Sequence, residues 1–209
     1  MNPWYEVPLE DYESHMAQAS VGQATMLADE FEHAVRVSRP RSVAVLGCAG
    51  GNGFERAASA DVQRLVGIDI NQSYLTRAAE RFTAEFPTLE LQCLDLGGTM
   101  PSMAPVDLVY GGLVFEYLDV RIALGNIRGL SRPGSRLVAV LQQPSASFGA
   151  LSPTRFATLD ELATIFTYVD ADDFVDVASA YRFQELNRRV VSLASGKAFS
   201  VVTLVANPA

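Results

Sequence analysis

The sequence predicts an α/β protein with a doubly wound, mostly parallel sheet of seven strands that ends in an antiparallel hairpin. Three observations lead to this fold class. Five short apolar segments alternate with mostly helical sequence between residues 41 and 141. The first segment breaks into a cluster of four glycines before a helix-compatible stretch. Near the end of the chain, a turn with one glycine joins two further strand-like segments.

Two amphipathic helices are predicted before the first strand. Apolar residues recur at helical spacing from Leu9 to about Ser20, and again from Val21 to Val35. Pro40 ends the second helix, because a proline disfavours helical backbone at the residue before it.

Strands and helices then alternate. The predicted strands are residues 42–46, 64–70, 89–94, 106–110, 136–141, 181–193 and 199–206. The helices between them run from the glycine cluster to about Ala60, from Asn71 until Phe86-Pro87 ends that helix, and from Asp119 to Leu130. Asn71 and Asp119 carry side-chain oxygens suited to an N-cap, and Thr158 is predicted to cap a further helix to about Tyr168. Residues 132–134, Arg-Pro-Gly, predict a turn before the fifth strand.

Composition narrows the functional classes. The chain has 209 residues, a formal net charge of -8 and a pI near 4.7, whereas nucleic-acid-binding proteins usually carry a basic surplus. No apolar run approaches the roughly 20 residues that span a bilayer. We therefore expect neither nucleic acid nor membrane as a partner. We expect one domain, residues 1–209, in which residues 1–40 precede a core of residues 41–209.

The N-terminus and the cysteines favour a cytoplasmic location. The first residues are acidic and lack the apolar region of a signal peptide. Cys48 and Cys93 lie in apolar, strand-like sequence and are expected to be buried, reduced side chains. His15 and His33 are the only histidines, and no spacing of cysteine and histidine predicts a metal site.

The glycine cluster, residues 47–53, is the first functional signal. A strand, a tight glycine turn and a helix N-terminus bring bare backbone, unpaired N–H groups and a positive dipole end to one place. This arrangement is typical of a nucleotide-like cofactor site.

Asp69 is the second signal, because it stands about 20 residues after the turn, at the end of the second predicted strand. A carboxylate there can accept hydrogen bonds from both hydroxyls of a ribose. The alternative function of Asp69 is to cap the following helix. The glycine turn upstream favours ribose binding.

The spacing of the glycines excludes two common nucleotide motifs. The dinucleotide pattern has glycine at its first, third and sixth positions, which here hold Gly47, Ala49 and Asn52. The Gly-Lys-Ser/Thr sequence of a phosphate-binding loop is absent.

Residues 45–53 resemble the first motif of the class I S-adenosylmethionine-dependent methyltransferases, an apolar strand followed by Gly-x-Gly-x-Gly, here Gly47-x-Ala49-x-Gly51. Four further segments similar to that family follow in its order, residues 67–71, 93–96, 106–113 and 130–135. The resemblance covers roughly residues 41–141, and the hairpin extends it. It implies a Rossmann-like fold, methyl transfer as the activity and S-adenosylmethionine as the cofactor.

The resemblance also implies the cofactor-binding residues. The turn would contact the methionine part, Asp69 the ribose, Ile70 the adenine ring and Asp95 the adenine amino group. The full set is Gly47, Cys48, Ala49, Gly51, Asn52, Asp69, Ile70, Asp95, Leu96, Tyr110 and Gly111. Alanine replaces the central glycine of the family at position 49, which predicts a negative φ there.

The expected reaction is direct displacement at the methyl carbon, in which the protein aligns the acceptor and excludes water. A base is needed where the acceptor carries a proton. The candidates are His15, Tyr12, Asp11, Glu116 and Tyr117. We expect a small-molecule acceptor with a carboxylate, hydroxyl or amine, above the carboxyl ends of strands one and four. Residues 9–35 and 145–158 would form a lid.

Three alternatives stay open. A non-catalytic S-adenosylmethionine-binding protein or partner subunit would keep the fold without turnover. An NAD-dependent oxidoreductase would need nicotinamide binding at the same turn, which the glycine spacing disfavours. An aminopropyl transferase would need a run of acidic residues for a polyamine after strand four, and no such run follows that strand.

Overall fold

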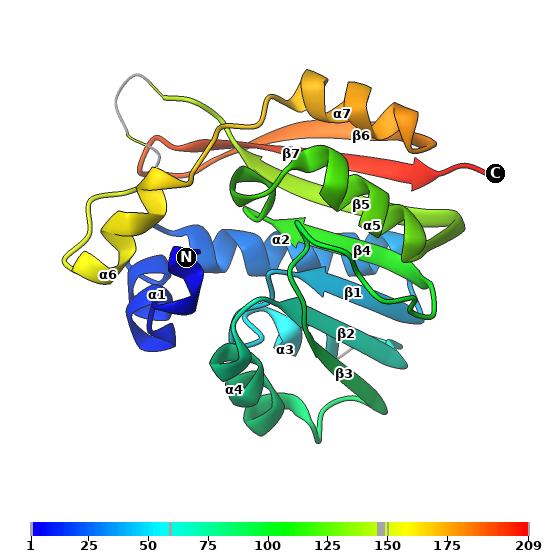
Figure 1. The fold of residues 1–209 in the computed structure, drawn as a ribbon, viewed down its shortest axis with the longest axis horizontal. Helices are drawn as coiled ribbons and strands as arrows, with labels where there is room; N and C mark the ends of the chain where they lie inside the picture. Colours follow the sequence, from blue (N-terminus) through cyan, green and yellow to red (C-terminus); the bar gives the residue numbers. More distant parts are fainter. Residues whose placement is uncertain (1, 59, 146–148, 150, 209) are drawn as a thin grey trace.

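The computed structural model describes residues 2–58, 60–145, 149 and 151–208. Its centre is a seven-stranded sheet with the order β3-β2-β1-β4-β5-β7-β6 (Figure 1). The strands are β1 (Ser42–Leu46), β2 (Arg64–Asp69), β3 (Thr88–Cys93), β4 (Val106–Gly112), β5 (Ser131–Gln142), β6 (Phe183–Ser192) and β7 (Ala198–Ala206). The first five are parallel, and β7 pairs antiparallel with both β5 and β6. The predicted fold class is confirmed.

Helices cover both faces of the sheet (Figure 1). One face packs against α2 (Gln23–Ser38), α3 (Phe54–Ala58) and α4 (Gln72–Phe82), and the other against α5 (Val120–Gly129) and α7 (Ala171–Ala180). The short helices α1 (Leu9–Met16) and α6 (Ala157–Asp160) lie together beside the N-terminus, at one edge of this sandwich (Figure 1). Three 3-10 helices, η1 (Pro3–Tyr5), η2 (Phe115–Tyr117) and η3 (Glu161–Thr164), complete the elements.

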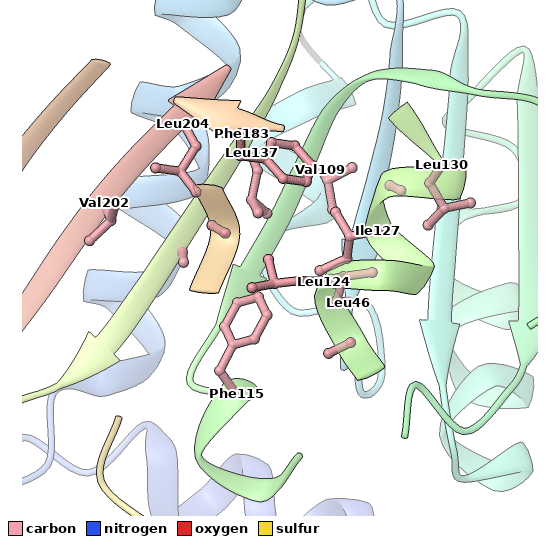
Figure 2. Packing of buried hydrophobic residues seen from close by; sticks show 14 of the residues in the cluster. Leu46, Val109, Phe115, Leu124, Ile127, Leu130, Leu137, Phe183, Val202 and Leu204 are labelled. Carbon is pink, nitrogen blue, oxygen red and sulfur yellow. The ribbon is translucent and has the colours of Figure 1, made fainter. Parts of the chain in front are cut away.

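The largest core cluster fills the space between the sheet and the helices α5 and α7. Figure 2 shows Leu124 and Ile127 of α5 in one cluster with Leu46 and Val109 of the sheet. Central strands read as continuous apolar runs because both faces of a parallel sheet are buried. Phe115 of η2, just beyond β4, is fully buried in the same cluster, so the core fixes the loop after β4.

Two predicted N-caps are confirmed. Oδ1 of Asn71 accepts from the Ser73 N–H at 3.0 Å, and Oδ1 of Asp119 accepts from the Arg121 N–H at 2.8 Å. The cap at Thr158 is wrong, since that residue lies inside α6 and Phe156 occupies the N-cap position. The Thr158 hydroxyl instead donates to Oδ2 of Asp11 at 2.8 Å, which joins α6 to α1.

Two other predictions need correction, one helix was missed, and one prediction falls partly outside the described residues. The turn at residues 132–134 lies inside β5, where the register against β4 shifts. Cys48 is buried but Cys93 is exposed, because β3 is an edge strand. Helix α7 was not predicted, although its signal is the N-cap Asp170, which accepts from two N–H groups of the first turn. The predicted lid 145–158 includes residues 146–148 and 150, which lie outside the described residues.

Within the described part of the chain, no helix combines the length and the apolar character that a bilayer span requires.

Candidate functional site

A cavity with about 640 Å³ of empty space, part of it open to solvent, lies at the carboxyl ends of β1, β2 and β4. We call it the glycine-turn cavity. Parallel sheets bind ligands at this edge, where the strand order reverses direction. It is lined by Asn2, Trp4, Tyr12, Gly47, Ala49, Asp69, Ile70, Tyr74, Leu94, Asp95, Leu96, Gly112, Leu113, Val114, Tyr117 and Leu118.

The turn after β1 requires glycine at two positions. Gly47 has φ +60° and Gly51 has φ +83°, which side chains rarely adopt. A Cβ on Gly47 would lie 3.0 Å from Cγ2 of Val114, and one on Gly51 would lie 2.7 Å from the ring of Phe82. The turn therefore combines left-handed backbone with close packing, and Gly47 reaches the cavity as bare backbone.

Ala49 shows that one sequence prediction is wrong. Its φ is +47°, not negative. The Ala49 N–H donates to Oδ2 of Asp69 at 2.8 Å, and this bond holds the turn in the left-handed form although a Cβ is present. Left-handed backbone costs a residue with a Cβ roughly 1–2 kcal/mol.

Replacing Ala49 with Gly is expected to stabilise the fold. The relief of strain is partly offset by the greater freedom of glycine in the unfolded chain, leaving a gain of about 0.5–1 kcal/mol. Thermal unfolding checks this as a melting temperature raised by about 2 °C. The control Ala79→Gly lies inside α4 and should lower stability by about 1 kcal/mol. Equal destabilisation by both variants would contradict a strained Ala49.

Asp69 connects the turn to the next helix. Its Oδ2 accepts from Ala49 and its Oδ1 accepts from the Asn71 N–H at 2.9 Å. Burial raises its pKa, although these backbone N–H donors oppose the rise. The N-cap of α4 is Asn71 and not Asp69, so Asp69 does not have the alternative capping function. Each carboxylate oxygen can accept two hydrogen bonds, which leaves acceptor capacity towards the cavity that Asp69 lines.

Another part of the cavity lining is more apolar. Ile70 and Leu96 line it together with Leu94 and Leu118. Asp95 is exposed at its rim, where Oδ1 accepts from the Gly97 N–H at 2.8 Å. This set of residues fits an adenosine: apolar side chains for the base, one carboxylate for an amino group and another for a diol.

Not every predicted residue lines this cavity. Cys48, Asn52 and Tyr110 line a smaller adjoining cavity. The hydroxyl of Tyr110 donates to the carbonyl of Leu27 at 2.8 Å, so it ties β4 to α2. Gly51 packs against Phe82, and a Cβ on Gly111 would lie 2.7 Å from the ring of Phe115.

Trp4, which the sequence analysis did not include in the site, lines the glycine-turn cavity together with the candidate residues Tyr12 and Tyr117. The Trp4 ring lies edge-on to Tyr12 and Tyr117, with centroids 5.5 and 5.2 Å apart. Its carbonyl accepts from Nδ2 of Asn71 at 3.0 Å, and the Tyr74 hydroxyl donates to the carbonyl of Val7 at 2.8 Å. These bonds hold the N-terminal segment against the cavity. No motif marks them, because the contacts join residues about 67 positions apart.

A second cavity, with about 560 Å³ of empty space, shares Trp4, Tyr12, Leu113 and Tyr117 with the first. We call it the polar-end cavity. His15 lines it, is buried, and has an Nδ1 atom without a hydrogen-bond partner among the described residues. Burial and the nearby Lys197 lower the pKa of His15, so the imidazole is neutral at pH 7. Burial and Asp69 raise the pKa of Tyr12, so the phenol stays protonated.

Glu116 is buried beside this cavity but does not line it. Its Oε1 accepts from the Gln142 N–H at 2.7 Å, whereas its Oε2 has no partner in the described part of the chain. Burial raises the pKa of the carboxyl to about 7. Asp11, another predicted candidate for the base, is bonded to Thr158 and lines neither cavity.

The variant Glu116→Gln tests whether burial raises the pKa of this carboxyl. A folded-state pKa of about 7 against an ordinary 4.5 means that Glu116 contributes stability below pH 4.5, which is lost as pH rises to 7. Glutamine keeps the acceptor for Gln142 and cannot ionise, so at pH 8 the variant should be more stable by about 2 kcal/mol. Urea unfolding at pH 5 and pH 8 measures this difference in stability.

At pH 5 the gain in stability should shrink to less than about 1 kcal/mol, because this pH lies only just above the ordinary pKa of 4.5. The control Glu85→Gln alters an exposed carboxylate and should change stability by less than about 0.5 kcal/mol at either pH. A Glu116→Gln protein that is less stable than the native chain at pH 8 would show that the carboxylate is ionised and bonded in the fold.

Comparison with known proteins identifies a matching family model. Residues 43–134 match the family model described as a methyltransferase domain. The N-methyltransferase NodS from Bradyrhizobium japonicum WM9, in complex with S-adenosyl-L-homocysteine, has a TM-score of 0.70 and 18% identity, with 100% of both chains covered. No curated protein sequence matches the chain.

Two further solved structures share the fold. The [4+2]-cyclase SpnF has a TM-score of 0.68 and 15% identity, over 88% of this chain and 82% of that one. The 1,6-didemethyltoxoflavin-N1-methyltransferase of Burkholderia thailandensis has a TM-score of 0.66 and 14% identity, over 88% and 79%. Residues 43–134 thus match a methyltransferase-domain model, and the chain shares its fold with S-adenosylmethionine-dependent methyltransferases of known structure.

Proposed function

We propose that the protein transfers the methyl group of S-adenosylmethionine to a small-molecule acceptor. The observation that carries the proposal is the pair of cavities that meet at Tyr12. The first has the residues that suit an adenosine, and the second adjoins it and shares four of its lining residues. Neighbours of the same fold include a methyltransferase named for a small molecule, 1,6-didemethyltoxoflavin.

The chain's own residues have distinct tasks in this proposal. Asp69 would accept from the ribose hydroxyls and Asp95 from the adenine amino group, with Ile70 and Leu96 against the base. The bound cofactor supplies an electrophilic methyl group. Trp4 and helix α1 would cover the site as a lid, so that water is excluded and the acceptor is aligned, whereas α2 of the predicted lid packs on the sheet as part of the core.

His15 is the residue that we propose as the base for an acceptor that carries a proton. It is neutral at pH 7, buried, and has an unbonded Nδ1 within the described part of the chain. Tyr12 has the opposite property, because its raised pKa keeps the proton on the phenol. His15 would remove the acceptor proton, and Tyr12 would form the wall between acceptor and cofactor.

A methyl-transfer assay tests the proposal. The protein is incubated with tritium-labelled S-adenosylmethionine and a panel of small hydroxyl, amine and carboxylate acceptors. We expect one acceptor class to yield labelled product and S-adenosylhomocysteine in equal amounts. Cofactor binding without transfer to any acceptor would contradict the proposal. The fold alone does not decide the reaction, since one structure with this fold is named a [4+2]-cyclase.

A further inference from the structure

The polar-end cavity has four buried polar side chains at one end. His15, Gln23, Gln142 and Lys197 are each no more than 5% exposed. They come from α1, α2, the end of β5 and the residue before β7. Lys197 is the only lysine in the sequence, although the chain has many arginines. Placing the one lysine of a protein inside a cavity is unusual, because buried ammonium groups are costly.

Hydrogen bonds organise this polar end. Oε1 of Gln142 accepts from Nε2 of Gln23 and from Nζ of Lys197, each at 3.4 Å. The backbone N–H of Gln142 donates to Glu116, which holds the end of β5 in place. The Lys197 carbonyl accepts from the Leu193 N–H at 2.8 Å and closes the hairpin turn. Backbone hydrogen bonds at the end of β5 and in the hairpin turn therefore hold Gln142 and Lys197 in position.

The charge that the described lining residues bring to this cavity is positive. Among the described residues that line this cavity there is no aspartate or glutamate, whereas Lys197 supplies a cation and Gln23 supplies amide donors. His15 stays neutral beside it, since Lys197 itself lowers the histidine pKa. Burial lowers the pKa of Lys197 as well, which an anion bound next to the ammonium would reverse.

The remainder of the cavity is mostly apolar and aromatic. Leu113, Tyr117, Leu159, Leu162 and Phe166 are among the residues that line it, and Ser152 and Thr154 add two hydroxyls, so most of this lining suits a hydrophobic body. A single cation matches a single negative charge better than a dianion such as a phosphate monoester. Lys197 does not line the glycine-turn cavity. An anion at Lys197 is thus held away from the methyl-donor side.

We propose that the polar-end cavity binds an aromatic carboxylic acid, whose carboxylate is anchored by Lys197 with Gln23 as a second donor. This inference rests on the proposed function, because it names the substrate class of the same site. The aromatic body would extend from Lys197 towards Tyr12, where the acceptor atom meets the cofactor.

The unique lysine makes a direct experiment possible. Protein labelled with ¹³C,¹⁵N-lysine gives one side-chain signal, which reports on Lys197 alone. Benzoate, benzamide and benzylamine are titrated as probes of equal shape, with and without saturating S-adenosylhomocysteine. We expect benzoate to shift the lysine signal and to bind about tenfold more tightly than benzamide, with benzylamine weaker still.

Variants separate charge from shape. Lys197→Met should reduce the preference for benzoate over benzamide to less than about threefold, and Lys197→Arg should keep it. Arg121→Met, an exposed change on α5, should alter nothing. Equal affinity of the native chain for benzoate and benzamide, or an unchanged preference in Lys197→Met, would overturn the inference. The binding of S-adenosylhomocysteine, titrated separately, tests the proposed function independently of this result.

Discussion

Replacing Asp69 with Asn is expected to weaken the binding of S-adenosylhomocysteine by about 100-fold. The carboxylate accepts from two backbone N–H groups and retains acceptor capacity for two hydroxyls. An asparagine has one oxygen, so it cannot accept at both ends, and it loses the charge that strengthens each bond. Isothermal titration of the variant and the native chain measures the change.

The fold must be intact for this comparison to be meaningful. Asp69 is buried and its N–H partners belong to the turn, so thermal unfolding of the variant is recorded as well. Asp119→Asn is the matched control, because it makes the same chemical change at the N-cap of α5, where asparagine serves equally well. A folded Asp69→Asn protein that binds within about twofold of the native affinity would remove Asp69 from the ribose site.

Replacing His15 with Gln is expected to lower kcat by about 100-fold for an acceptor that must lose a proton, with little change in KM. Glutamine is of similar size and polar, but it cannot take up a proton. His33→Gln is the matched control, because His33 is the other histidine and is exposed on α2. It should retain native activity.

The pH profile distinguishes a base from a structural residue. His15 must be neutral to accept a proton, and burial holds its pKa below the ordinary 6.5. Activity of the native chain should therefore fall only at pH values below 6.5, and this acidic limb should be absent in His15→Gln. An acidic limb that persists unchanged in the variant would assign the base to another group.

The sheet could be predicted because its strands are buried on both faces and carry their own signal. Strand β1, Ser42–Leu46, has the predicted bounds. The caps Asn71 and Asp119 act through hydrogen bonds to nearby residues, which can be predicted from the local sequence. Helix α7 also has a local signal in its N-cap Asp170, which the sequence analysis missed, whereas the role of Thr158 depends on a tertiary contact. The Thr158 hydroxyl bonds to Asp11, 147 positions away.

The site was predictable where one strand end determines a residue's position. Asp69, Ile70, Asp95 and Leu96 follow directly from strand ends, and all four line the glycine-turn cavity. The aromatic contacts of Trp4 and the cluster around Lys197 join elements that are distant in sequence. Periodicity and spacing contain no information about such contacts, so the polar-end cavity became visible only in three dimensions.

The most direct test of the central claim is the titration of the native chain with S-adenosylhomocysteine, followed by competition. The cavity at the glycine turn predicts one bound molecule per chain, displaced by S-adenosylmethionine and not by excess NADH, because the glycine spacing and Asp95 suit an adenosine without a second nucleotide. No detectable binding of S-adenosylhomocysteine, or its displacement by NADH, would contradict the account.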